Sequence, residues 1–165
     1  MTAEQYERWA GSLRRRPAAV RTLIAVNRAL MLVGYVAYPL LLLIVLLQGD
    51  SPLLARCVLA PGLAFAAVTF FRAWRDAPRP FEALPIEPLI PRGTQGKSFP
   101  SRHTFSLFMI ALAWLAVQPV VGIVLLLLAC VLAVVRVLGG VHFPRDVIAG
   151  AAFAIAAFLL GFVLI

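Results

Sequence analysis

The stretch TLIAVNRALMLVGYVAYPLLLLIVLLQ, residues 22–48, is one long apolar run in which Arg28 is the only charged residue. A helix needs about 20 apolar residues to cross the hydrocarbon core of a bilayer, so this run is long enough to span a membrane. Four further runs of the same kind follow it, at residues 52–71, 101–118, 119–138 and 144–165. The sequence therefore predicts an all-α, polytopic transmembrane bundle with about five spans.

The composition of the whole chain agrees with this prediction. Hydrophobic residues make up 62% of the sequence and charged residues 13%, and the mean hydropathy is +0.96. Soluble domains have about 45–50% apolar and about 25% charged residues, so an ordinary soluble protein is excluded. At 165 residues the chain has the size of one domain, and we expect residues 1–165 to form a single membrane-embedded unit.

The first twenty residues differ from the rest because they are polar and rich in arginine. Tyr6, Trp9 and Leu13 recur there at helical spacing among charged side chains. This pattern is typical of a short amphipathic helix that lies on the membrane surface, and we expect residues 1–20 to form one. A cleavable signal peptide is not expected, because the segment lacks an apolar core.

The basic residues are distributed unevenly over the two faces of the predicted bundle. Five crossings place residues 72–100 and 136–145 on the same face as the N-terminus, together with all of the fifteen lysines and arginines except Arg28 and Arg56. These residues do not form a separate basic tail with interleaved aromatics, so nucleic acid is not an expected partner. Basic residues at the ends of apolar segments indicate lipid headgroups or a phosphorylated substrate at the membrane surface.

Three short segments on that face carry the polar chemistry: RAWRDAPRP at residues 72–80, PSRH at 100–103 and RVLGGVHFPRD at 136–146. Arginine binds phosphate oxygens through two parallel N–H groups and stays charged when partly buried. Ser101, at the start of an expected helix, would add outward-facing backbone N–H groups, which favour phosphate. The three segments together predict an anion site.

Two histidines and one carboxylate accompany these arginines. Asp146 follows His142 by four residues, in the first turn of an expected helix, and could accept a hydrogen bond from one imidazole nitrogen. The other nitrogen would then be free to attack, and His103 could donate a proton to the leaving oxygen. The same three residues are also plausible metal ligands, although a ring of arginines would repel a cation.

The order Arg-x6-Arg-Pro, then Pro-Ser-x-His, then Arg-x5-His-x3-Asp resembles the three-part signature of the type-2 phosphatidic acid phosphatase family. The resemblance implies that His142 is a nucleophile forming a phosphohistidine, that Asp146 orients it and that His103 protonates the leaving group. It also implies that no cofactor or metal is needed. Phosphate contacts are implied for Arg72, Arg79, Ser101 and Arg136, and we add Arg102 and Lys97 from their positions.

The chain departs from the family pattern at several points. Many members have glycine in place of Arg102, lysine in place of Arg72 and serine in place of Val135, and members commonly have six spans. The replacement of glycine by Arg102 removes a flexible position and adds another donor for oxygen. These departures bear on the choice of substrate more than on the chemistry.

The resemblance implies an integral-membrane lipid phosphatase. We favour undecaprenyl pyrophosphate as the substrate, with phosphatidic acid and phosphatidylglycerol phosphate as alternatives. Two other classes of function stay open: an anion transporter or channel, and a catalytically silent protein that binds phospholipids. Only the enzyme would need His142.

Residues 72–100 are expected to form the active-site loop, because the part after Pro80 is rich in proline and glycine. Its segment ALPIEPLIP, residues 83–91, either guides a lipid tail at the interface or is a plain connector. Family members of the bacterial cell envelope place the site outside the plasma membrane, whereas the N-terminal arginines favour the cytoplasmic side. We expect the outward orientation, and the oligomeric state stays open.

Overall fold

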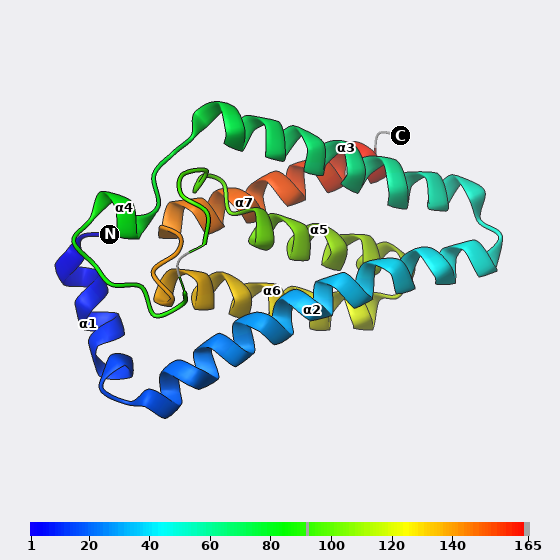
Figure 1. The fold of residues 1–165 in the computed structure, drawn as a ribbon. Coiled ribbons are helices and arrows are strands. Elements are labelled where there is room, and N and C mark those ends of the chain that lie inside the picture. Colours follow the sequence, from blue (N-terminus) through cyan, green and yellow to red (C-terminus); the bar gives the residue numbers. More distant parts are fainter. Residues whose placement is uncertain (92, 164–165) are drawn as a thin grey trace.

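The computed structural model of the chain describes residues 1–91 and 93–163, so the predictions that involve Arg92 and Ile165 lie outside the described residues. The described chain is helical throughout its regular structure (Figure 1). Its elements are α1 (Ala3–Arg14), α2 (Pro17–Gln48), α3 (Ser51–Arg75), α4 (Pro80–Ala83), α5 (Arg102–Val117), α6 (Pro119–Leu138), α7 (Pro144–Phe158) and a closing π-helical turn (Leu159–Val163). The predicted all-α bundle is confirmed.

The helix boundaries follow from local residue chemistry. Pro17, Pro119 and Pro144 each occupy a first turn, where a missing backbone N–H costs nothing. Because Pro17 suits this position, α2 begins five residues earlier than its apolar run. Helix α2 ends at Gly49, whose φ of 74° is readily adopted only without a side chain.

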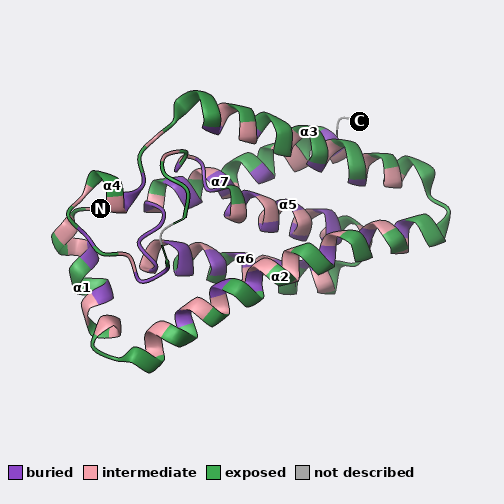
Figure 2. Cartoon of the chain, in the orientation of Figure 1, coloured by how far each residue is buried: buried purple, intermediate pink, exposed green. Residues whose placement is uncertain are grey.

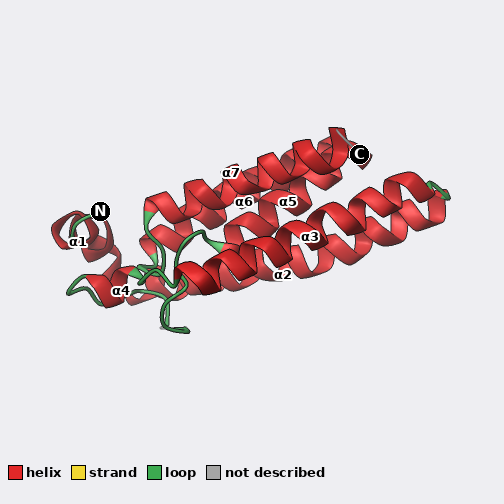
Figure 3. Ribbon diagram, turned by 90° about the horizontal axis from the view of Figure 1, so that it is seen from above, coloured by secondary structure: helices red, strands yellow, loops and turns green. Residues whose placement is uncertain are grey.

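By length and composition, α2, α3, α6 and α7 with its π-helical turn are long and apolar enough to cross a membrane. Helix α5 is shorter than expected, at 16 residues, because Ser101 and Gln118 cap its ends instead of extending it. It packs against each of those four helices and lies in the middle of the bundle (Figures 1 and 3). Because α5 lies in the middle, its side chains contribute to the bundle interior although the helix is short. The outer sides of the surrounding helices face outward.

The outer surfaces of α2 and α3 carry large exposed apolar side chains, and Figure 2 shows exposed residues along much of both helices. Leu47 is 77% exposed and Phe70 is 75% exposed. Water would penalise so extensive an apolar surface, whereas lipid chains cover it. The protein is an integral membrane protein.

One end of the bundle holds the N-terminus, α1, α4 and the long connection between α3 and α5 (Figure 1). Tyr6 and Ala10 of α1 are buried against Ile86, Ile90 and their neighbours in that connection, whereas Trp9 is 43% exposed. Of the apolar side chains at the predicted helical spacing, Tyr6 therefore packs against the protein and Trp9 stays at the surface of α1. The buried side of α1 supports the connection.

Hydrogen bonds also tie α1 to the long connection. The Tyr6 hydroxyl donates to the carbonyl oxygen of Glu87 at 3.4 Å, and Arg14 Nη2 donates to the same oxygen at 2.6 Å. The connection contains the short helix α4 and is otherwise irregular, as its proline and glycine content predicts. Helix α1 therefore holds the connection at Glu87, a backbone position far from both ends of the connection.

Candidate active site

A cavity of about 470 Å³ lies at this end of the bundle, and basic side chains from several elements line it. The motif residues among its lining are Arg72, Arg79, Lys97, Arg102, His103 and Arg136. They come from α3, the long connection, α5 and α6, so tertiary packing brings together segments up to 64 residues apart (136 − 72). Basic residues of the three sequence segments therefore line one cavity.

Arg72 and Arg79 are both buried and hold the long connection through its backbone. Arg72, in the last turn of α3, donates through Nη1 to the carbonyl oxygens of Ser98, at 3.2 Å, and Pro100. Arg79 donates through Nε to the Gly96 carbonyl oxygen at 3.1 Å. Each guanidinium has five N–H groups, so these bonds leave donors for an anion in the cavity.

Arg136, in the last turn of α6, is the buried arginine with the fewest protein partners. Its Nη1 donates to Asn27 Oδ1 of α2 at 3.4 Å, and among the described residues no acceptor bonds its buried Nε. A buried N–H without a partner is costly, and an oxygen of a bound ligand would satisfy it. Sequence reasoning missed Asn27, because a single asparagine within an apolar run gives no indication of the residue that it contacts.

The charges around the cavity repel one another. Burial lowers the pKa of Arg79, and the charge of Arg102 lowers it further, while Glu82 and Asp146 oppose both effects. Arginine remains protonated at neutral pH in spite of such a shift. Like charges held together in a partly dry space favour an anion between them, which is what a phosphate-binding site requires.

His142 and Asp146 lie next to this cavity and are buried almost completely. His142 Nδ1 lies 3.6 Å from Asp146 Oδ2, a direct contact that is longer than a usual hydrogen bond. Ser98 stands between them: its hydroxyl lies 2.6 Å from Asp146 Oδ2 and 3.3 Å from His142 Nδ1. The backbone N–H of Phe143 also donates to Asp146 Oδ2, at 2.9 Å, which holds the carboxylate at the start of α7.

This arrangement assigns a tautomer to the imidazole. Ser98 donates its hydroxyl proton to the Asp146 carboxylate, so its oxygen is left to accept from His142 Nδ1–H. A proton on Nδ1 leaves Nε2 with a free lone pair, which is the state that a nucleophilic histidine needs. Ser98, like Asn27, was missed by sequence reasoning, since only its position beside the Pro-Ser-x-His segment could have drawn attention to it.

Ser101 occupies a different environment from the one expected. It is the N-cap residue of α5, but its side chain makes no capping bond, and its hydroxyl accepts from Thr104 at 3.0 Å. It is fully buried, and it is not among the residues that line the cavity in the described structure. Its backbone N–H donates to the Asp146 carbonyl oxygen at 2.8 Å, so it joins α5 to α7 behind the site.

Comparison with known proteins identifies the family. The profile of the PAP2 superfamily matches residues 53–165, which contain all three motif segments and more than half of the chain. The chain belongs to the PAP2 superfamily. The resemblance to the type-2 phosphatidic acid phosphatases is thereby confirmed. No curated protein sequence matches the chain at the significance required.

Two solved structures are similar to this PAP2 chain. LpxE from Aquifex aeolicus has a TM-score of 0.74 and 26% identity, over 97% of this chain and 93% of the other. A PAP2-type phosphatidylglycerolphosphate phosphatase from Bacillus subtilis has a TM-score of 0.54 and 21% identity, over 96% of this chain and 91% of the other. The first similarity extends over α1 as well as the bundle, and the second shows the fold.

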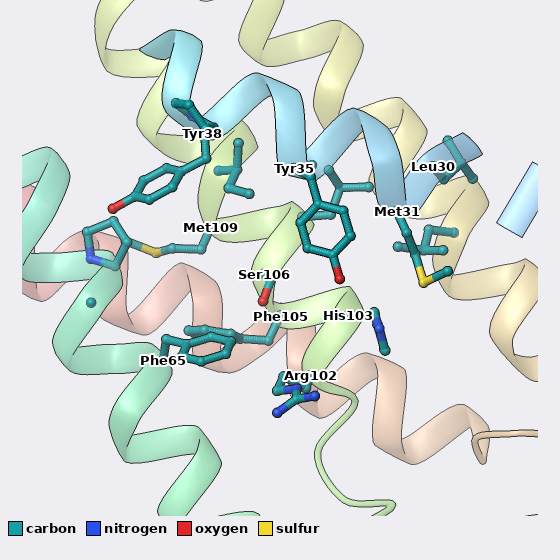
Figure 4. Close-up of a pocket in the computed structure, with 17 residues that line it drawn as sticks. Leu30, Met31, Tyr35, Tyr38, Phe65, Arg102, His103, Phe105, Ser106 and Met109 are labelled. Atoms are coloured by element: carbon teal, nitrogen blue, oxygen red, sulfur yellow. The ribbon is translucent and has the colours of Figure 1, made fainter. Parts of the chain in front are cut away.

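The PAP2 chain has a second, apolar cavity of about 550 Å³ between α2, α3 and α5. Its lining includes Met31, Tyr35, Phe65 and Met109, and Figure 4 shows these side chains around it. Arg102 and His103 line this cavity and the arginine-lined cavity alike. The two spaces therefore meet at the start of α5.

Removal of the Ser98 hydroxyl from this PAP2 protein should lower kcat about 10–100-fold and leave KM nearly unchanged, in assays of phosphate release. The Ser98→Ala variant keeps the nucleophile but lets the imidazole adopt the wrong tautomer or rotate. Thr104→Val, which removes another buried hydroxyl near the start of α5, is the matched control and should change kcat less than about 3-fold. Equal losses in both variants would indicate a structural role for Ser98.

The protonation of His142 gives a second prediction. Burial lowers the pKa of His142, the charges of Arg136 and Arg79 lower it further, and Asp146 opposes them. A lowered pKa means that the imidazole stays neutral, and able to attack, as the pH falls through the usual value of about 6.5. In a His103→Gln variant every histidine signal belongs to His142, because the chain has two histidines. Titration followed by ¹⁵N NMR should place its midpoint below about pH 5.5; a midpoint at or above 6.5 would contradict the prediction.

Proposed function

We propose that this protein is an integral-membrane lipid phosphatase that hydrolyses a phosphate ester or pyrophosphate bond of a lipid. The observation that carries the proposal is the junction of the two cavities at Arg102 and His103. A molecule with a phosphate head and a hydrocarbon tail matches an arginine-lined space joined to an apolar one. The membership of the PAP2 superfamily supports it, and the structural similarity to LpxE and to a PAP2-type phosphatidylglycerolphosphate phosphatase agrees in fold.

In the first step, His142 Nε2 attacks the phosphorus atom and forms a P–N bond while the bond from phosphorus to the leaving oxygen breaks. His103 donates a proton to that oxygen, and the lipid product departs. Arg79 and Arg136 neutralise the charge on the transferred phosphoryl oxygens, which is greatest in the transition state. The Asp146–Ser98 pair stabilises the imidazolium that forms on His142.

In the second step, water attacks the phosphohistidine. The now neutral His103 takes a proton from this water, the P–N bond breaks and inorganic phosphate leaves. The sum of both steps is lipid phosphate plus water to dephosphorylated lipid plus phosphate, and the histidines return to their starting states. No step calls for a metal or a cofactor, and metal independence is part of the proposal.

Undecaprenyl pyrophosphate is the substrate that we favour, and phosphatidic acid and phosphatidylglycerol phosphate are the alternatives. The test is phosphate release from each of these lipids by the purified full-length protein in detergent, with a chelator present. We expect phosphate release from at least one lipid. This release should continue in the presence of the chelator and should disappear in a His142→Ala variant. Release that the chelator abolishes would overturn the metal-free mechanism.

Two other outcomes would assign a different function. Binding of these lipids without phosphate release would indicate a catalytically silent lipid-binding protein. Passage of phosphate into vesicles that contain the protein, with no hydrolysis, would indicate an anion transporter or channel. His142→Ala separates the three cases, because hydrolysis alone depends on its nucleophilic nitrogen.

We also propose that the site faces outward from the plasma membrane of a bacterium. On a background without Cys57 and Cys130, a Glu4→Cys variant labels the site face and a Gln48→Cys variant the opposite face. Both residues are exposed; Glu4 belongs to α1 and Gln48 is the last residue of α2, and α1 and the connection from α2 to α3 lie at opposite ends of the bundle (Figure 1). An impermeant thiol reagent added to intact cells should react with Glu4→Cys and not with Gln48→Cys. The reverse pattern would place the site in the cytoplasm.

A further inference from the structure

Arg102 differs from the other arginines of the site in its surroundings. Arg72, Arg79 and Arg136 are buried and each donates to protein oxygen atoms. Arg102 is exposed, and within the described structure no protein oxygen accepts a hydrogen bond from it. Its guanidinium carbon lies 5.7 Å from the centroid of the Phe65 ring, a contact that orients the group and leaves its N–H edges available.

The position of Arg102 is as distinctive as its surroundings. It lines both the arginine-lined cavity and the apolar cavity, and Figure 4 shows it beside His103 and near Phe65. The charge of Arg102 also lowers the pKa of Arg79, so it acts on the space that holds the phosphate. A guanidinium with free donors therefore stands where a lipid tail would join its headgroup.

The neighbour of Arg102 fixes which part of a substrate it meets. His103, on the same first turn of α5, is the proposed donor of a proton to the leaving oxygen. The leaving oxygen therefore lies near Arg102, and the group attached to it extends toward the apolar cavity. In a lipid monophosphate this group is an uncharged carbon skeleton, whereas in a lipid pyrophosphate it is a second phosphate.

We propose that Arg102 binds the phosphate that stays on the lipid, and so selects lipid pyrophosphates over lipid monophosphates. This inference rests on the proposed function and names its substrate class. When the bridging P–O bond of a pyrophosphate breaks, negative charge accumulates on the phosphate that departs with the lipid. Arg102 stabilises this charge through a bidentate contact, which acts on the transition state and hence on kcat.

The test compares two probes with the same tail, farnesyl pyrophosphate and farnesyl monophosphate, in identical detergent micelles. The wild-type full-length protein should have a kcat/KM at least about 10-fold higher for the pyrophosphate. Arg102→Ala should lower kcat/KM for the pyrophosphate about 100-fold, mainly through kcat, and change the monophosphate value less than about 3-fold. Arg102→Lys keeps the charge but lacks the planar guanidinium, so its kcat/KM for the pyrophosphate should lie between those of the wild type and Arg102→Ala.

The matched control is Arg75→Ala, because Arg75 is an exposed arginine in the last turn of α3 that does not line either cavity in the described structure. It should leave both rates within about 2-fold of wild type. Thermal unfolding of each variant shows whether a loss of rate reflects loss of the fold, and a folded Arg102→Lys keeps the comparison valid if Arg102→Ala unfolds.

The outcomes separate the inference from the function on which it rests. Equal losses on both probes in a folded Arg102 variant would show that Arg102 contacts the transferred phosphate, and would overturn the inference alone. Equal rates of the wild type on both probes would also overturn the inference alone. Absence of phosphate release from every probe and lipid would overturn the proposed function, and the inference with it.

Discussion

Replacement of His142 by glutamine is expected to lower kcat for phosphate release by about 10⁴-fold or more, because the reaction loses its nucleophile. The imidazole is buried almost completely, and Ser98 holds it through Nδ1. Glutamine has a similar length and can keep a hydrogen bond to Ser98, but its amide nitrogen has no lone pair available for attack. The effect is therefore chemical, with little change in packing.

The intermediate provides a sharper readout than the rate. Farnesyl pyrophosphate labelled with ³²P at the terminal phosphate, mixed with enzyme and quenched at alkaline pH, should leave label on the wild-type protein and none on His142→Gln. His103→Gln should still become labelled and should lose the label slowly, because the base that activates water is missing. Label on the His142→Gln protein would place the nucleophile elsewhere.

Replacement of Arg136 by lysine is expected to lower kcat/KM about 10²–10³-fold, the second largest effect. Lysine keeps the positive charge but cannot bond Asn27 and a ligand oxygen at the same time from a planar group. The buried Nε of Arg136, which lacks a partner in the described structure, is the donor that a phosphoryl oxygen would complete. Loss of this donor in the transition state accounts for the size of the effect.

Arg75→Lys is the control for this substitution, since it makes the same change at an exposed arginine in the last turn of α3. It should change kcat/KM less than about 2-fold. Thermal unfolding should show that the Arg136→Lys protein is folded. If this folded protein were fully active, the assignment of Arg136 to the phosphate would be refuted. An Asn27→Ala variant, which frees the Arg136 guanidinium to move, should show a smaller loss of about 10-fold.

Much of the fold follows from the sequence, because the bilayer reduces helix formation to local composition. A run such as residues 119–138 must satisfy its backbone hydrogen bonds within itself, so length and hydropathy are enough to predict α6 (Pro119–Leu138) with its boundaries. The motif residues were predictable for a related reason. The alternation of apolar runs and polar connections puts Arg72, His103 and Arg136 at one end of the bundle whatever the details of packing.

Other features depend on distances between side chains, which composition does not reveal. His142 Nδ1 and Asp146 Oδ2 lie 3.6 Å apart, as their spacing in the chain suggests, but the spacing gives no sign that Ser98 contacts both of them. Helix α5 is shorter than its apolar run, and α1 buries Tyr6 and Ala10 against the protein, because the partner surfaces decide which side chains are buried.

By itself, then, the sequence determined the order of the long apolar helices, the end of the bundle that carries the polar motifs and the residue types of those motifs, since these depend on local hydropathy and spacing. Only the tertiary structure decided that Ser98 joins His142 to Asp146, that Asn27 meets Arg136 and that Arg102 stands where two cavities meet. These contacts join segments far apart in the chain, and their geometry is set by how helices of given side-chain volume pack against one another.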